Sequence, residues 1–273
     1  MTRPGESGRA AGVVTRPADR AVLSILFVVV AAPVAVLALR ALSATWFYPE
    51  ILPPAGSMTT LVALASDARL WRAGAVSAVL AAATGVGAAT IALAAGRVIA
   101  RAPKAVRTAA GAAALLPVIA PPIALGVGLQ VVALRAYVSG TFWGVLFAHL
   151  VPATGYLTLY FLGVLSAYDW SLEDEARTLG AAPHQVLARV ALPVLRPRLV
   201  EAVVLGALIS WAQLALTLVV GAGAVRTLPV ELLALVRSGD DRLAAAAALA
   251  LTVPPALAVS LLARGARRTG TVA

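Results

Sequence analysis

The segment Ala73–Gly96, which reads AGAVSAVLAAATGVGAATIALAAG, contains no charged residue. About 20 apolar residues are enough to cross the hydrocarbon core of a bilayer as a helix. A helix is required there because it satisfies its own backbone hydrogen bonds, which lipid cannot do. The segment therefore predicts a membrane-spanning helix, and it sets the fold class because similar segments recur along the chain.

Five other charge-free segments are long enough to span, so the prediction is an all-α integral membrane protein with six transmembrane helices. In the longest of them, Ser139-Gly140-Thr141 is expected to lie outside the membrane and Phe142–Leu165 to cross it. The five segments are Ala21–Leu39, Thr108–Leu134, Ala136–Tyr168, Ala202–Val225 and Leu243–Ala263.

The first segment is longer than the apolar part of a signal peptide, which is about 7–15 residues, so we expect a retained anchor. Cleavage after Ala41–Ala44 is the alternative. On this basis the chain divides into a tail (1–20), a first helix with an outer loop (21–64), a transmembrane core (65–265) and a second tail (266–273). The loop contains Trp46-Phe47-Tyr48-Pro49, an aromatic group suited to the headgroup layer.

The composition excludes a soluble protein, because 61% of the 273 residues are hydrophobic and 12% are charged. A soluble domain typically carries about 25% charged residues. The net charge of +10 does not indicate nucleic-acid binding, since the basic residues lie between the apolar segments. Cysteine is absent, so the sequence predicts neither a disulfide framework nor a thiolate metal site.

The basic residues also predict which segments face the cytoplasm, where loops carry an excess of Lys and Arg. Six spans place both termini on one side, and the segments of that side hold 15 of the 22 basic residues. Both termini are therefore expected in the cytoplasm. The 15 residues are Arg3, Arg9, Arg16, Arg20, Arg97, Arg101, Lys104, Arg107, Arg177, Arg189, Arg196, Arg198, Arg264, Arg267 and Arg268.

The segment after the fourth span, SLEDEARTLGAAPHQVLARVALP at 171–193, predicts two short helices joined at Gly180. Ser171 is expected to cap the first helix, together with Asp174 three residues on. Gly180 permits the tight turn that ends this helix. Val186–Val190 is expected to form a second helix that closes before Pro193. Such a pair of helices presents a knob to the cleft of a partner.

This segment resembles the EAA loop of binding-protein-dependent ABC importer permeases, written E-A-A-x3-G-x9-I-x-L-P. Asp174 replaces the first Glu of the triplet, and Glu175 stands where an Ala is usual. The resemblance implies that this loop couples the chain to a separate ATPase. The residues expected to carry the coupling are Glu173, Asp174, Glu175, Ala176, Gly180, Ala181, Val190, Leu192 and Pro193.

The resemblance also implies partners: an ABC ATPase dimer, a second permease subunit that is a homologous but different chain, and an extracytoplasmic substrate-binding protein. ATP and Mg would be bound by the ATPase, and no cofactor by this chain, which lacks a G-x-x-x-x-G-K-[ST] loop. The implied location is the bacterial inner membrane. The resemblance covers roughly residues 65–265, and within the family it is nearest to the polyamine, ferric iron, aminoethylphosphonate and thiamine permeases.

A few polar or proline residues inside the spans are candidates for the translocation pathway. Prolines in the third span indicate either a broken segment beside the pathway or a fixed kink. A buried His is a candidate for function by default, yet a neutral His bonded to a neighbouring helix fits as well. Three polar residues of the fifth span share one face, lining the path or joining helices. The candidates are Pro117, Pro121, Pro122, His149, Ser210, Gln213 and Thr217.

Two other classes of function compete with an importer subunit. A membrane-embedded enzyme should show converging His, Asp or Glu residues within its spans, and only His149 is centrally placed. A secondary transporter would usually show intramembrane carboxylates or an inverted repeat. Neither pattern is convincing here, so the importer permease is preferred.

Overall fold

The computed structural model describes residues 17–47, 49–53 and 55–269, and these residues are almost entirely helical. Within them, the β pairing is limited to an isolated bridge between Ser43 and Gly56. The predicted all-helical class is therefore confirmed. Residues 1–16 and 270–273, which include most of the two predicted tails, lie outside the described residues.

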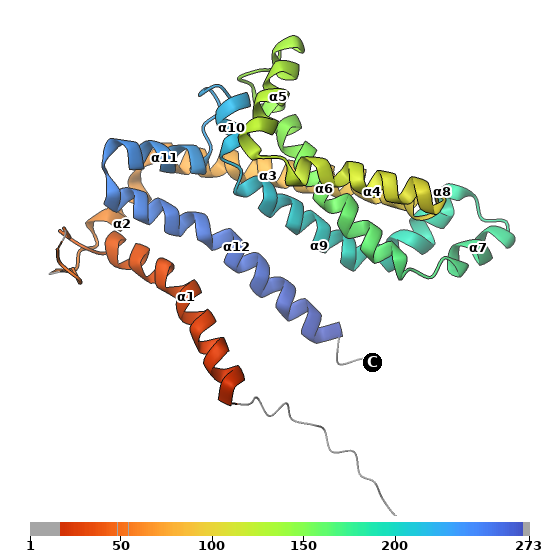
Figure 1. Cartoon of the computed structure of the whole chain (residues 1–273), viewed down its shortest axis with the longest axis horizontal. Coiled ribbons are helices and arrows are strands. Elements are labelled where there is room, and N and C mark those ends of the chain that lie inside the picture. The colour runs from red at the N-terminus through yellow and green to blue at the C-terminus, as the bar shows by residue number, and fades with distance from the viewer. Residues whose placement is uncertain (1–16, 48, 54, 270–273) are drawn as a thin grey trace, which may run out of the picture.

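The molecule is elongated, and its long helices run along the long axis, as Figure 1 shows. Helices α3, α4, α6 and α9 lie side by side, whereas α5 points away from them. The helices are α1 (Pro17–Ala41), α2 (Thr59–Ser66), α3 (Ala68–Ala100), α4 (Lys104–Ile119), α5 (Pro122–Arg135), α6 (Phe142–Ser166), α7 (Ser171–Thr178), α8 (Pro183–Val186), the π-helical turn η1 (Leu187–Ala191), α9 (Leu192–Trp211), α10 (Ala215–Val220), α11 (Leu228–Ser238) and α12 (Asp241–Thr269).

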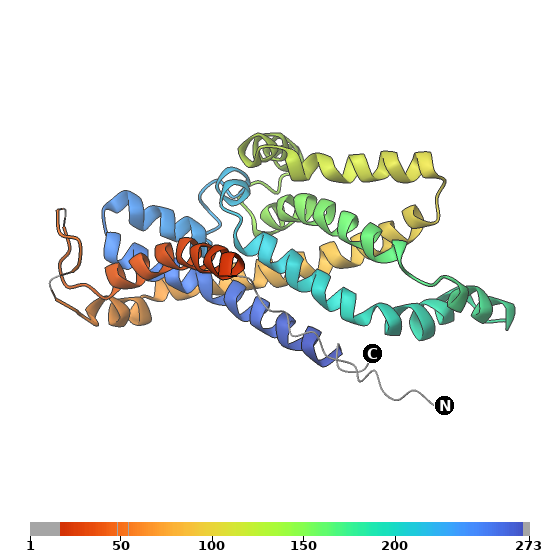
Figure 2. The ribbon, with the colours of Figure 1, turned by 60° about the horizontal axis from the view of Figure 1, so that its bottom comes forward.

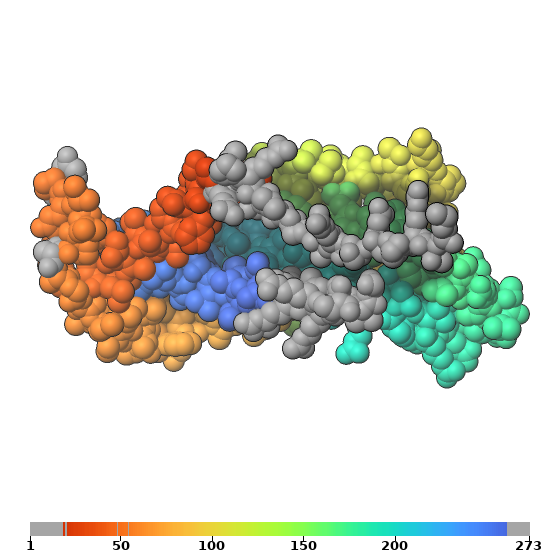
Figure 3. All heavy atoms as spheres, turned by 90° about the horizontal axis from the view of Figure 1, so that it is seen from below, coloured from red at the N-terminus to blue at the C-terminus, as the bar shows by residue number. Residues whose placement is uncertain are grey.

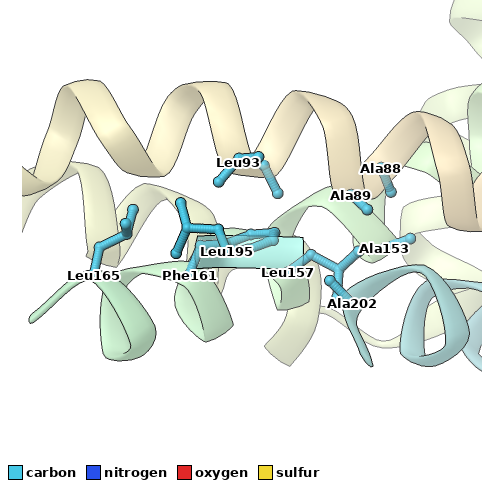
Figure 4. Close-up of a cluster of buried hydrophobic side chains, with 10 residues drawn as sticks. Ala88, Ala89, Leu93, Ala153, Leu157, Phe161, Leu165, Leu195 and Ala202 are labelled. Atoms are coloured by element: carbon cyan, nitrogen blue, oxygen red, sulfur yellow. The ribbon is translucent and has the colours of Figure 1, made fainter. Parts of the chain in front are cut away.

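The main core lies where α3 meets α6 and α9. Leu93 of α3 packs with Phe161 of α6 and Leu195 of α9, all three nearly inaccessible, and alanines fill the remaining space (Figure 4). Small residues allow the helix backbones to approach closely, which is how helices associate in lipid. At the crossing of α3 and α9, a Cβ added to Gly85 would lie 2.4 Å from the Val203 carbonyl oxygen. The core thus holds three helices as one unit.

Helices α1 and α12 form an outer layer at one side of this core. Figure 3 shows α1 lying against α12, and the contact is made by Ala41, Ala245 and Ala246 with neighbouring leucines. The outward face of α1 is apolar, with Phe27 72% exposed. An apolar face of this kind suits lipid, which agrees with the predicted first span.

The two ends of the molecule gather the loops that the sequence assigned to opposite sides. At one end, Arg97 of α3 forms an ion pair with Glu173 of α7. At the other end, Arg40 of α1 forms an ion pair with Asp241 of α12, and Arg242 donates to the Ala44 carbonyl. Figure 2 shows α7 and the segment between α1 and α2 at opposite ends. This separation is compatible with the predicted assignment of the loops, whose sides stay a prediction.

Four helices in the described part of the chain are long and apolar enough to cross a membrane, or five if a bent pair forms one span. The single helices are Ala21–Ala41, Ala68–Ala100, Phe142–Ser166 and Asp241–Ser260. The bent pair is α4 with α5, which meet at 101°. The break falls at Pro121-Pro122, because neither proline has an amide hydrogen for the helix ladder. The third predicted segment is therefore divided at its prolines, and whether this break lies beside a pathway stays a prediction.

The fifth predicted segment, Ala202–Val225, is not one continuous helix. Helix α9 ends at Trp211, residues 212–214 lie outside a helix, and α10 covers only Ala215–Val220. Helix α9 also begins ten residues earlier than the predicted span, at Leu192, and carries Arg196, Arg198 and Glu201. Arg198 pairs with Glu201 at 2.9 Å, so these charges meet one another near the end of the helix.

Candidate functional site

Helix α7 and its Gly180 turn project at one end of the molecule (Figures 1 and 2). Gly180 has φ +85°, the left-handed conformation that glycine adopts without strain. Its amide donates to the Arg177 carbonyl, and the next amide, of Ala181, donates to the Ala176 carbonyl. These two bonds are the Schellman arrangement that ends a helix. The predicted turn at Gly180 is confirmed.

The start of α7 differs from the prediction in its cap. Ser171 does not cap the helix, because it is already the first helical residue and its side chain donates to Asp169 at 2.7 Å. The Asp169 carboxylate also accepts the Ser171 amide at 3.0 Å. The N-cap position is Trp170, which has no side-chain cap bond, and the hydrogen bonds from Ser171 hold the pKa of the Asp169 carboxyl below its ordinary value.

The second short helix also differs from the prediction, since it does not close before Pro193. Helix α8 starts at Pro183, and the Gln185 side chain accepts the Ala182 amide at 3.0 Å. The chain then continues through the π-helical turn η1 directly into α9. The Leu192 amide donates to the Leu187 carbonyl five residues back. This wider turn precedes Pro193, which has no amide hydrogen and so cannot donate the i→i−4 hydrogen bond of a regular α-helix.

The buried face of α7 is anchored by Glu173, whose side chain is fully inaccessible. Arg97 donates two hydrogen bonds to the two carboxylate oxygens, at 2.8 and 2.9 Å. Arg177 donates a third at 3.0 Å, and Arg101 lies 3.6 Å away. Burial raises the pKa of Glu173, but the hydrogen bonds and charge of Arg97 outweigh it, and the pKa is held below its ordinary value.

Trp170 completes this cluster from the turn before α7. The Arg101 guanidinium lies 4.3 Å from the centre of the Trp170 ring and that of Arg97 lies at 5.6 Å. Tyr168 meets the same ring edge-on at 4.9 Å. A guanidinium at this distance is attracted to the face of an indole. We call Arg97, Arg101, Trp170 and Glu173 the α3–α7 joint.

The sequence predicted Glu173 as a coupling residue but did not pair it, and it treated Arg97 and Arg101 only as orientation charges. One signal was available: the two arginines are four residues apart, on one face of a helix end. A cluster of acidic residues, Glu173-Asp174-Glu175, lies in another segment assigned to the same side. Nothing in the sequence around Trp170 indicated its contact with these arginines.

The other predicted coupling residues divide between the exposed surface of this region and positions that are partly buried. Asp174, Glu175 and Gly180 are exposed, as is Pro193. Ala176, Ala181, Val190 and Leu192 are partly buried. Among the exposed residues is also Leu179, an apolar side chain that is 88% exposed at the tip. An exposed apolar residue beside acidic ones is the kind of surface that a protein partner covers.

Inside the spans, the structure joins three of the predicted polar candidates. His149 of α6 is buried, with Nδ1 2.8 Å from Ser210 Oγ and Nε2 3.0 Å from Thr217 Oγ1. The Thr217 hydroxyl donates its own proton to the Gln213 carbonyl. Thr217 therefore accepts from His149 Nε2–H, and in a neutral imidazole Ser210 then donates to Nδ1.

This arrangement supports the second interpretation of His149, a neutral side chain bonded to a neighbouring helix. Its two partners lie on either side of the break between α9 and α10, so His149 bridges that break. The Gln213 side chain is partly buried and makes no hydrogen bond within the described residues. The structure therefore brings His149, Ser210 and Thr217 together and leaves Gln213 apart from them.

The three prolines of the third span lie at and before its bend. Pro117 is inside α4 and packs on α6, where a Cβ added to Gly155 would lie 3.0 Å from the proline ring and 2.6 Å from the Ala114 carbonyl. Pro121 precedes α5 and Pro122 is its first residue. The role of these residues in a pathway stays a prediction.

The sequence of this chain was compared with protein-family models and with known proteins. Residues 88–268 match the family model described as "binding-protein-dependent transport system inner membrane component". The chain is 31% identical over 157 residues to a Salmonella paratyphi A protein provisionally named as the 2-aminoethylphosphonate transport system permease PhnV. It is 27% identical over 119 residues to the spermidine/putrescine permease PotC of Haemophilus influenzae.

These two matches cover 57% and 44% of this chain, and 59% and 46% of the relatives' own lengths. Among solved structures, a chain of a bacterial alginate importer of the ABC type superposes with a TM-score of 0.67 at 16% identity, over 90% of this chain and 94% of that one. A second structure, of an alginate transporter with its pentasaccharide-bound periplasmic protein, gives 0.68 at 14%, over 92% and 93%. At these identities, the superpositions support the fold.

Proposed function

The chain belongs to the family of binding-protein-dependent transport system inner membrane components, and from this premise we propose that it is one permease half of an ATP-driven ABC importer. The observation that carries the proposal is the projecting segment from α7 to η1. Its outward side carries acidic residues and an exposed Leu179, while its inward side is fixed to α3 through Glu173. The exposed surface of α7 is fixed to α3, so a partner that binds it and moves can transmit that movement.

The proposed topology has six spans with both termini in the cytoplasm of a bacterial inner membrane. The spans are α1, α3, the bent pair α4–α5, α6, the broken pair α9–α10, and α12. The excess of basic residues at the α7 end supports this orientation. The ion pairs at the two ends support it as well, because they join loops assigned to the same side.

The proposed partners are an ATPase dimer at the α7 end, a second permease chain, and a substrate-binding protein at the opposite end. ATP and Mg would be held by the ATPase alone. A homologous but different second chain is favoured, because the coupling loop departs from the usual triplet at Asp174 and Glu175. The ligands named for the relatives, 2-aminoethylphosphonate and polyamines, are the first substrates to test.

Site-directed crosslinking tests the docking of an ATPase. The chain has no cysteine, so a single cysteine at Ala176 or Ala182 would be its only thiol. Co-expressed with its ATPase, each variant should form a crosslink to that subunit with a short bifunctional reagent. The matched control is a cysteine at Phe47, which is 70% exposed at the opposite end and should give none. A crosslink from Phe47, or none from either alanine position, would contradict the proposal.

Coupling is tested separately through Gly180. A Cβ at this position meets open space, so a proline here acts on the backbone: on its positive φ and on the amide bond to the Arg177 carbonyl, which proline cannot donate. Gly180→Pro cannot adopt a positive φ and should abolish ATP-dependent uptake of 2-aminoethylphosphonate or putrescine, whichever the wild type transports. Gly163→Ala, with no atom near its Cβ and an ordinary φ, is the control and should transport normally. Normal uptake by Gly180→Pro would rule out this coupling role.

A further inference from the structure

Helix α7 has an unusual balance between its exposed and buried surfaces. Seven of its eight residues are exposed or partly exposed, and the one that is fully buried is a carboxylate, Glu173. Burial of a charged group is unfavourable unless it is paired and hydrogen-bonded. Helix α7 is therefore not held by an apolar face of its own, and its attachment to the rest of the molecule depends on the partners of Glu173.

The partner geometry is rigid. Arg97 meets both oxygens of Glu173 in a fork-on-fork pair, which fixes direction as well as distance. Arg97 is itself 17% exposed and lies over the Trp170 ring, as does the Arg101 guanidinium. The pair is thus shielded from water on several sides and keeps its strength where a surface pair would lose it.

The far side of the pair leads directly into the core. Arg97 follows Gly96, whose position is so tight that a Cβ would lie 3.0 Å from the Phe161 side chain of α6. One turn earlier, Leu93 belongs to the cluster that joins α3 to α6 and α9. Without the pair, the side-chain contact between α7 and the end of α3 would be reduced to the longer Arg101–Asp174 pair at 3.5 Å, beside the packing of α7 on α8 and η1 and the chain itself.

We propose that Glu173 is a positioning residue: its pair with Arg97 fixes α7 to the end of α3, so that a displacement of α7 by the ATPase moves α3 and the core with it. This proposal rests on the function proposed above, and it corrects the role predicted for Glu173, which would act behind the docking surface and not on it. The exposed neighbours Asp174 and Glu175 remain on the outer surface. A purely local role, in which Glu173 only neutralises Arg97, is the alternative to test against.

A distance measurement tests the joint directly in the full-length chain in lipid nanodiscs. Spin labels at Val98→Cys on α3, where Val98 is 74% exposed, and at Thr178→Cys on α7 report the separation of the two helices. With Glu173 present we expect a single narrow distance distribution. Glu173→Gln should lose that narrow population. Glu175→Gln makes the same chemical change on the exposed face of α7 and should keep it.

A second variant keeps the test valid if Glu173→Gln folds poorly. Arg97→Gln with Glu173→Gln removes both charges, so no unpaired arginine remains buried, yet the charged fork is also gone. We expect the broad distribution to persist in this double variant. A narrow distribution in the double variant would show that the single variant suffered only from an unpaired charge. That result would overturn the proposal.

Transmission is tested in the complex with the co-expressed ATPase. In the wild type, the Val98–Thr178 distance should stay the same between the nucleotide-free complex and the complex trapped with ATP and vanadate. In Glu173→Gln it should shift on trapping, because α7 then moves without α3. An equal shift in both would overturn the proposal. If no ATPase co-purifies with the wild type, the proposed function fails, while the result on the isolated chain still decides whether the joint exists.

Discussion

At the scale of single residues, two buried polar groups carry most of the specific geometry, and they work differently. His149 is neutral and makes one donating and one accepting bond inside the bundle. Glu173 is charged and lies on α7, outside the long helices of the bundle and within reach of three arginines. The first joins two pieces of a broken helix to α6, and the second joins a peripheral helix to the core.

Substitution of His149 is expected to destabilise the fold modestly. His149→Leu should lower the free energy of unfolding by about 1–2 kcal/mol, the upper part of the range for hydrogen bonds between membrane helices. Because Thr217→Val removes the same bond from the other side, the double variant should lose less than the sum of the two. Unfolding in mixed micelles measures both effects. Gln213→Leu is the control and should change stability little; a larger loss there than at His149 would contradict this assignment.

The pKa of Glu173 predicts a loss of stability in acid. The groups facing its carboxylate are Arg97, Arg101 and Arg177, together with Asp174 and the Tyr168 phenol. Since the folded pKa lies below the ordinary 4.5, the contribution is complete above that value and is lost as pH falls through the lowered pKa. The difference in melting temperature between wild type and Glu173→Gln should therefore be constant near neutral pH and shrink in acid. A difference that grows in acid would contradict this.

At the scale of the elements, glycine positions decide how closely the helices pack. Gly85 and Gly206 face each other where α3 crosses α9, with Gly85 close to the Val203 carbonyl. Gly96 and Gly155 have the same function against α6 and α4. Each of these glycines lies on a helix whose composition is much like that of the neighbouring helices. How close two helices come therefore depends on which helix faces meet, and the sequence of one helix alone does not give it.

A pair of substitutions on α3 separates packing from helix propensity. Gly85→Ala should lower the free energy of unfolding by about 1–3 kcal/mol, the usual cost of overpacking, because its Cβ meets backbone atoms. Gly74→Ala, on the same helix with no atom within 4 Å, should be neutral or stabilise by about 1 kcal/mol at most. Thermal unfolding of the two purified variants provides the comparison. Equal effects at both positions would show that the α3–α9 contact is looser than described.

At the scale of the whole molecule, the arrangement is a bundle with two chemically distinct ends. One end carries the α3–α7 joint and an acidic, exposed tip, and the other carries the Arg40–Asp241 ion pair between α1 and α12. The broken elements, α4–α5 and α9–α10, lie between them, and α5 packs against α10. The described helices are therefore continuous where they support the ends and interrupted in the middle.

The orientation of the two ends can be measured in intact cells. Thr178→Cys at the α7 end should be protected from a membrane-impermeant maleimide until the cells are opened. Phe47→Cys at the other end should react at once, because it is exposed and lies in the proposed outer loop. The cysteine-free wild type is the blank. The reverse pattern of labelling would invert the proposed topology.

The sequence by itself determined the helical class, the approximate positions of four long apolar helices and the turn at Gly180. These follow from local properties: runs of apolar residues and a glycine where a helix must stop. The tertiary structure alone decided that the third segment turns by 101° and that the fifth is divided. It also decided that His149 bridges that division and that Glu173 faces inward to Arg97. Such features depend on which helix faces lie against each other, and a carboxylate has the same local sequence pattern whether it meets water or an arginine 76 positions away.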